Sequence, residues 1–103
     1  MSYTLDICGE KKIQNPTEAD IRQAISILDA DKNSAFLILG TWDMTYIQSS
    51  GDTKDGFDLE YQDGDLKHHY RANKFKAEEI IKAMTSYSTG TDNWKKTAEW
   101  KQI

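Results

Sequence analysis

The sequence predicts an α+β protein: an antiparallel sheet of about five strands with two helices packed on one face. Two observations lead to this fold class. Apolar residues recur at helical spacing in the segments 15–28 and 75–88, and strand-like alternation fills much of the remaining chain. The chain has 103 residues, of which 38% are hydrophobic, which suits one domain with one core. We therefore expect a single α+β domain over residues 1–103.

The N-terminal part is predicted to form a strand with a short returning arm. Residues 3–7 alternate in polarity, which is typical of a half-buried strand, and residues 12–14 follow after Gly9. Cys8 is the only cysteine, so the chain has no internal disulfide. We expect Cys8 to be a strand residue rather than a nucleophile.

The first helix is predicted to begin at Asn15. Asn15 is a good N-cap, Pro16 suits the first helical position, and Glu18 completes a capping box. One apolar stripe follows at i, i+3, i+4 and i+7: Ile21, Ala24, Ile25 and Leu28. The polar segment 29–33 ends this helix.

Two strands are expected next. The apolar run 35–39 is too short for a buried helix and favours a central strand covered on both faces. A turn over 40–43 leads to a strand over 44–50, and a polar loop covers 51–55.

The clearest local signal is a hairpin around Asp63-Gly64. Residues 57–61 and 66–70 alternate, and Asp63-Gly64 favours a two-residue type I′ turn between them. The register that this turn sets pairs Glu60 with Lys67, Asp58 with His69, and Phe57 with Tyr70. Opposite charges then share one face and apolar rings the other.

The C-terminal part is predicted to hold the second helix and a packed tail. Its apolar stripe consists of Ala77, Ile80, Ile81, Met84 and Tyr87. Gly90 is a suitable helix stop, Asp92 can cap a short turn, and residues 98–103 form an edge strand or a packed tail. Trp94 and Trp100 either cover the end of the sheet or serve, like Trp42, as interface anchors.

Charge limits the function classes. The net charge is −4, which disfavours general binding to nucleic acid. Carboxylates concentrate between Asp43 and Asp65, either as ordinary solvated surface or as a patch that steers a basic partner. No signal peptide or apolar run of membrane-spanning length is present, so we expect a cytoplasmic protein without a membrane partner.

No catalytic, metal or cofactor site is expected. His68 and His69 are adjacent, and on a strand they would point to opposite faces, His68 beside Leu59 and His69 outward. Asp65-Leu66-Lys67 has a spacing found in nucleases, but the motif is short and the net charge is wrong for DNA. The serines lack a nucleophile elbow and the glycines form no phosphate loop.

The residues from about 34 to 100 resemble a known group of proteins. The resemblance is carried by Gly56-Phe57-Asp58-Leu59-Glu60-Tyr61-Gln62-Asp63-Gly64, by His69-Tyr70-Arg71-Ala72, by Gly90-Thr91-Asp92-Asn93-Trp94 and by Trp100. This pattern is similar to the Imm-type immunity proteins of bacterial polymorphic-toxin systems, and to closely similar uncharacterised small bacterial α+β proteins. The resemblance implies an α+β protein that binds and blocks a toxin domain, and it supplies no catalytic residues.

We therefore expect a non-catalytic binding protein, with an immunity protein against a basic toxin domain as the first hypothesis. A small-ligand-binding protein with a pocket between sheet and helices is the alternative. The expected partner-binding residues are Trp42, Asp43, Asp58, Glu60, Lys67 and His69.

Overall fold

The α+β fold class is confirmed. The structure is a computed structural model, and it describes residues 3–30, 36–41, 44–91 and 93–102. Seven antiparallel strands form one sheet in the order β2-β1-β3-β4-β5-β6-β7. The strands are β1 (Thr4–Ile7), β2 (Lys11–Gln14), β3 (Leu37–Gly40), β4 (Thr45–Asp52), β5 (Gly56–Asp63), β6 (His69–Phe75) and β7 (Lys101–Gln102). The short edge strands β2 and β7 extend the sheet beyond the five strands expected.

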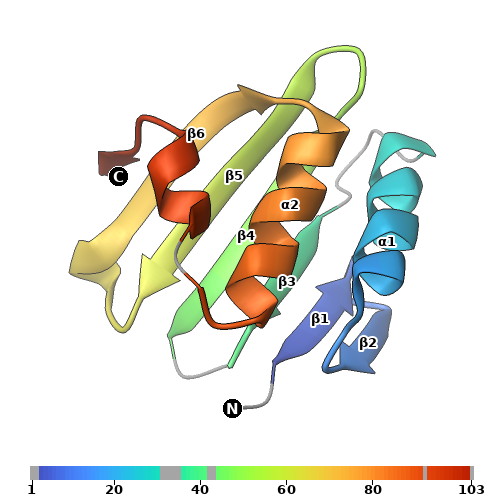
Figure 1. Cartoon of the computed structure of the whole chain (residues 1–103), viewed down its shortest axis with the longest axis horizontal. Coiled ribbons are helices and arrows are strands. Elements are labelled where there is room, and N and C mark those ends of the chain that lie inside the picture. Colours follow the sequence, from blue (N-terminus) through green and yellow to red (C-terminus); the bar gives the residue numbers. More distant parts are fainter. Residues whose placement is uncertain (1–2, 31–35, 42–43, 92, 103) are drawn as a thin grey trace.

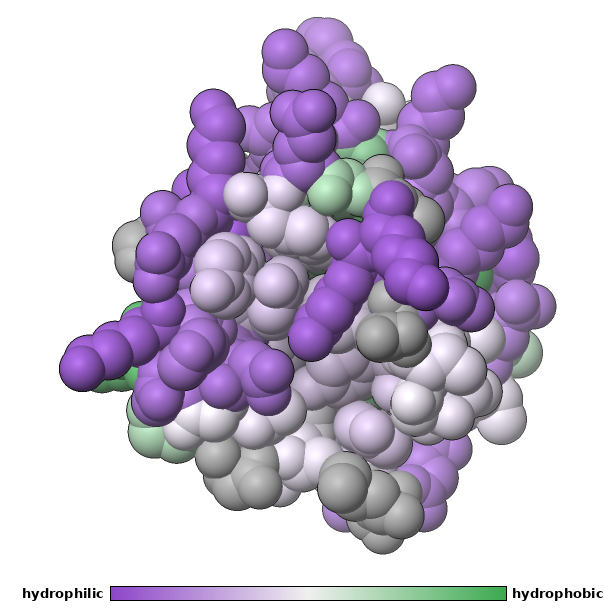
Figure 2. All heavy atoms as spheres, turned by 60° about the vertical axis from the view of Figure 1, so that its left-hand side comes forward, coloured by the Kyte–Doolittle hydropathy of each residue, from purple (hydrophilic) through white to green (hydrophobic). Residues whose placement is uncertain are grey.

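Both helices lie on the same face of the sheet. Figure 1 shows α1 (Glu18–Ala30) and α2 (Ala77–Ser88) side by side in front of the strands. Their apolar stripes face the core, as predicted: Ile21, Ala24, Ile25, Leu28, Ile80, Ile81, Met84 and Tyr87 are buried, and Ala77 is half-buried against the same core. No helix in the described ranges is long and apolar enough to cross a membrane. Hydrophilic side chains cover most of the side of the molecule that Figure 2 shows.

The start of α1 differs from the prediction. Asn15 has a φ of +47° and is not the N-cap. Instead its side-chain oxygen accepts a hydrogen bond from the backbone N–H of Tyr3 at 3.2 Å. Thr17 caps the helix: its hydroxyl accepts from the Asp20 N–H, and the Asp20 carboxylate accepts from the Thr17 N–H. This reciprocal pair is a capping box displaced from the expected one, because Asn15 is hydrogen-bonded to Tyr3, the residue before β1.

Alternation along the strands separates the two faces of the sheet. Leu39, Ile47 and Leu59 are fully buried and face the helices. Their neighbours along the same strands, Ile38 and Glu60 among them, point the other way and are only half-buried. The expectation that the run 35–39 is covered on both faces is therefore wrong, because both helices lie on one side. We call the helix-free side the open face.

The predicted register of the 57–70 hairpin is wrong. Glu60 lies opposite Arg71, Tyr61 opposite Tyr70, and Phe57 opposite Phe75. A short 3-10 helix, η1 (Leu66–His68), stands between the strands in place of a two-residue turn. The Asp65 carboxylate caps it by accepting from the N–H groups of Lys67 and His68. Because η1 occupies residues 66–68, β6 begins only at His69, and each residue of β5 therefore lies opposite a later residue of β6 than predicted.

A type I′ geometry occurs instead between β1 and β2. Cys8 and Gly9 have φ values of +56° and +74°, and the N–H of Glu10 donates to the carbonyl of Ile7 at 3.0 Å. These are the two positive φ values that a type I′ turn requires. Cys8 is therefore a half-buried turn residue, not a strand residue as expected.

The C-terminal tryptophans belong to the core. The 3-10 helix η2 (Asn93–Thr97) carries Trp94, which is buried, and Trp100 is half-buried just before β7. Both rings meet Tyr61 edge-on, each with a centroid distance of 4.8 Å. They pack over β5 on the helix side of the sheet (Figure 1), so the interface hypothesis for these two residues is not needed. Asp92 and Trp42 lie outside the described residues.

Candidate functional site

Three of the predicted contact residues come together on the open face. Glu60 and Asp58 lie two positions apart on β5, and His69 begins β6, paired with Gln62. All three are half-buried. They share this face because strand side chains alternate with a period of two.

Lateral contacts hold these side chains in place. Arg71 donates to the Asp58 carboxylate at 2.8 Å, and the Gln48 amide donates to Glu60 at 2.7 Å. The His69 Nε2 lies 3.5 Å from Glu60 Oε1. The predicted pairing of His69 with Asp58 is therefore replaced by one with Glu60, as the register shift requires.

Tyr46 borders the same group. Its ring meets that of His69 edge-on at a centroid distance of 6.2 Å. Burial, followed by the nearby Glu60 carboxylate, raises the pKa of the Tyr46 hydroxyl. The half-buried Tyr46 ring therefore forms an aromatic border to this group.

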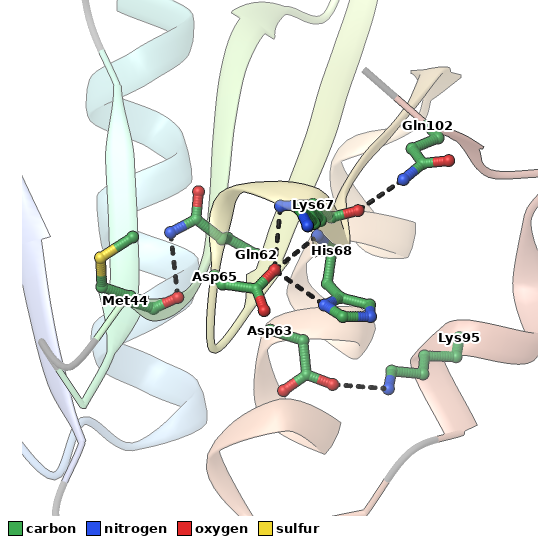
Figure 3. Close-up of polar contacts among 8 residues, drawn as sticks. All are labelled: Met44, Gln62, Asp63, Asp65, Lys67, His68, Lys95 and Gln102. Atoms are coloured by element: carbon green, nitrogen blue, oxygen red, sulfur yellow. Dashed lines mark hydrogen bonds and ion pairs between the residues drawn. The ribbon is translucent and has the colours of Figure 1, made fainter.

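Lys67 does not join this group. It lies on η1 at the loop end, which is the end of the sheet formed by the turn before β4 and the loop 64–68 after β5. Figure 3 shows this loop, with Asp65 turned toward the η1 backbone and toward the His68 ring. The Gln102 amide donates to the Lys67 carbonyl, which ties β7 to the loop. The predicted Glu60–Lys67 pair is thus absent, because Lys67 lies on η1 before β6 begins and Arg71 stands opposite Glu60.

His68 also departs from its expected place. It was expected on the apolar face beside Leu59, but it is exposed on η1 and its Nδ1–H donates to Asp65 at 2.8 Å. Asp65, the acid of the nuclease-like tripeptide, is thereby occupied as a helix cap. Trp42 and Asp43 lie outside the described residues.

Two exposed apolar side chains at the loop end were missed. Leu66 is 71% exposed and Met44 is 46% exposed. The Met44 carbonyl accepts from the Gln62 amide at 3.0 Å and from the Gly64 N–H at 3.2 Å, so the two segments are tied together. Aspartate is a preferred N-cap residue, so Asp65 could have indicated a helical turn over 66–68 and with it the longer loop that carries Leu66.

Within the described residues, the carboxylates of the acidic stretch do not form one patch. Asp52 is buried and accepts from the Asp55 N–H at 2.7 Å, at the far end of β4. Asp63 pairs with Lys95 on the helix side, while Asp58 pairs with Arg71 on the open face. Of the two interpretations of this stretch, the geometry favours ordinary structural and surface roles.

A cleft of about 370 Å³ lies on the helix side of the sheet, where β4 begins and β5 ends. Its aromatic walls are Tyr3, Tyr61, Tyr87 and Trp94, and Asp63 and Lys95 supply its charges. This position matches the pocket between sheet and helices that the ligand-binding alternative requires.

The described ranges hold no cluster of three or more histidine, cysteine or acidic side chains that could bind a metal ion. Comparison with protein families, with curated proteins and with solved structures finds no match for this chain.

Proposed function

We propose that this chain is a non-catalytic binding protein that uses the open face of its sheet to bind another protein. The observation that carries the proposal is the group formed by Asp58, Glu60 and His69. All three side chains are half-buried, and hydrogen bonds hold Asp58 and Glu60, so these two lose little side-chain freedom when a partner binds. The exposed Leu66 and Met44 at the adjoining loop end add apolar contact area.

The partner we propose is a basic toxin domain, with the chain acting as its immunity protein in the bacterial cytoplasm. The resemblance described above and the net charge of −4 support this partner. On the open face, however, acids are matched by bases: Asp6 lies opposite Lys12, and Glu60 opposite Arg71. The net charge would therefore speed the approach, and the alternating charges of the face would set the orientation.

Co-expression tests this proposal. The chain is expressed together with the product of the adjacent reading frame, and growth is measured. We expect the chain to prevent growth arrest by that product, and the double variant Asp58→Lys/Glu60→Lys to lose protection while remaining folded by circular dichroism. A matched control, Glu10→Lys/Glu18→Lys, changes the net charge equally at two exposed positions outside the open face, one after the β1–β2 turn and one on α1, and it should still protect.

Two results would contradict the proposal. One is growth arrest despite abundant, folded wild-type chain. The other is protection by the open-face variant that equals protection by the control variant, because the open face would then not be the contact surface.

The aromatic cleft supports a second candidate function, the binding of a small ligand. Its volume of about 370 Å³ is at the lower end of typical ligand pockets. It lies on the helix side of the sheet, so the open-face reversals should leave ligand binding unchanged.

A further inference from the structure

The aromatic cleft already holds a cation. The Lys95 Nζ lies 5.4 Å from the ring centroid of Tyr61 and 5.4 Å from that of Trp94. It also lies 3.9 Å from Asp63 Oδ2, and Figure 3 shows the two side chains directed toward one another. Aromatic faces attract cations, and a carboxylate adds to this attraction.

The fit of Lys95 to this place is incomplete. Its contact with Asp63 is long for an ion pair, and the lysine side chain is 40% exposed while that of Asp63 is 61% exposed. An ammonium is a strongly hydrated point charge on a flexible stem, so Lys95 can leave the cleft at little cost. A guanidinium is flat, stacks on aromatic rings and binds a carboxylate through two parallel hydrogen bonds.

We propose that the cleft is a binding site for a planar organic cation of the guanidinium class, which takes the place of the Lys95 ammonium. The cation would stack against Tyr61 or Trp94 and pair with Asp63, with Lys95 displaced toward solvent. This inference rests on the second candidate function, for which it names the ligand class, and it does not depend on the open face.

The probes are methylguanidinium and its neutral analogue methylurea, each titrated into the isolated chain. The readout is the indole N–H signal of Trp94 by NMR. We expect a saturable shift with methylguanidinium and none with methylurea. The Lys95→Met variant removes the internal competitor at similar length, so the affinity for methylguanidinium should rise roughly three- to tenfold. Asp63→Asn should lower the affinity, and the matched control Lys96→Met should not change it.

A peptide arm identifies the source of the cation. The peptide acetyl-Gly-Arg-Gly-amide is compared with the same peptide carrying neutral citrulline in place of arginine. Tighter binding of the arginine peptide than of methylguanidinium assigns the site to a protein side chain. Equal or weaker binding assigns it to a free small cation. Both results support the proposed chemistry.

Other outcomes would overturn the inference. Equal binding of methylurea and methylguanidinium would show a ligand cleft without preference for cations, which leaves the second candidate function in place. Absence of binding by both probes, in the wild type and in a folded Lys95→Met variant, would overturn the inference and would leave the second candidate function only for ligands of another class. Unchanged affinity on Lys95→Met would show that Lys95 does not occupy the site.

Discussion

The side-chain amide of Gln62 donates a hydrogen bond of 3.0 Å to the carbonyl of Met44. Gln62 is buried at the end of β5, and Met44 precedes β4, so this bond joins the two segments of the loop end. We expect Gln62→Met to lower the free energy of unfolding by about 1–2 kcal/mol, because a buried hydrogen bond is lost. Urea denaturation measures the change. The exposed Gln14 is the control, and Gln14→Met should cost less than ~0.5 kcal/mol.

Two isoleucines provide a matched test of the helix packing. Ile80 of α2 is fully buried, whereas Ile27 of α1 is 41% exposed. Ile80→Ala should lower the free energy of unfolding by roughly 2–4 kcal/mol, because it leaves a cavity in the core. Ile27→Ala should lower it by no more than ~0.5 kcal/mol. Equal losses in the two variants would contradict the placement of α2 on the sheet.

The capping of η1 has a pH signature. The hydrogen bond from the His68 ring, followed by the backbone N–H groups of the turn, holds the pKa of the Asp65 carboxyl below its usual value. A carboxyl with a lowered folded pKa contributes stability above its unfolded pKa, and that contribution is lost as the pH falls through the folded pKa. The loop should therefore be ordered at neutral pH and loosen only in acid.

An NMR titration of the Asp65 carboxyl carbon checks this expectation. In His68→Ala the pKa of Asp65 should move up toward its usual value, since the largest cause of the shift is gone. The same pKa in the wild type and in His68→Ala would show that the ring does not act on this carboxyl.

The ion pair between Asp58 and Arg71 should fix the orientation of these two side chains on the open face but add little to the stability of the fold. Their side chains are 31% and 49% exposed, so water screens the attraction. A double-mutant cycle with Asp58→Ala and Arg71→Ala should give a coupling energy of about 0.2–1 kcal/mol. A coupling above ~2 kcal/mol would mean that the pair is part of a buried network and is unsuitable as a free contact surface.

The candidate site was only partly predictable. Asp58 and Glu60 share the open face as alternation along a strand requires, and His69 joins them. Lys67 and His68 were misplaced because Asp63-Gly64 is a strong hairpin signal, yet the chain uses Asp65 to cap a longer loop. The exposure of Leu66 depends on that loop, and the position of the Lys95 ammonium depends on η2. Neither short element produces a periodic hydrophobic pattern from which it could be predicted.

The sequence by itself determined the fold class, the two helices and the buried stripe of each, because spacing at i, i+3 and i+4 is a local property that any helix must show. Only the tertiary structure decided the register of β5 against β6 and the position of the C-terminal segment with η2 and β7. The observed register stacks Tyr61 on Tyr70 with ring centroids 5.1 Å apart, and brings Trp94 and Trp100 edge-on to Tyr61. The longest-range of these contacts, between Tyr61 and Trp100, joins residues that are 39 positions apart in the sequence. Two loops with similar local energy differ in the long-range aromatic packing that they allow, and this packing decides which loop forms. The local pattern of residues carries no information about these long-range contacts.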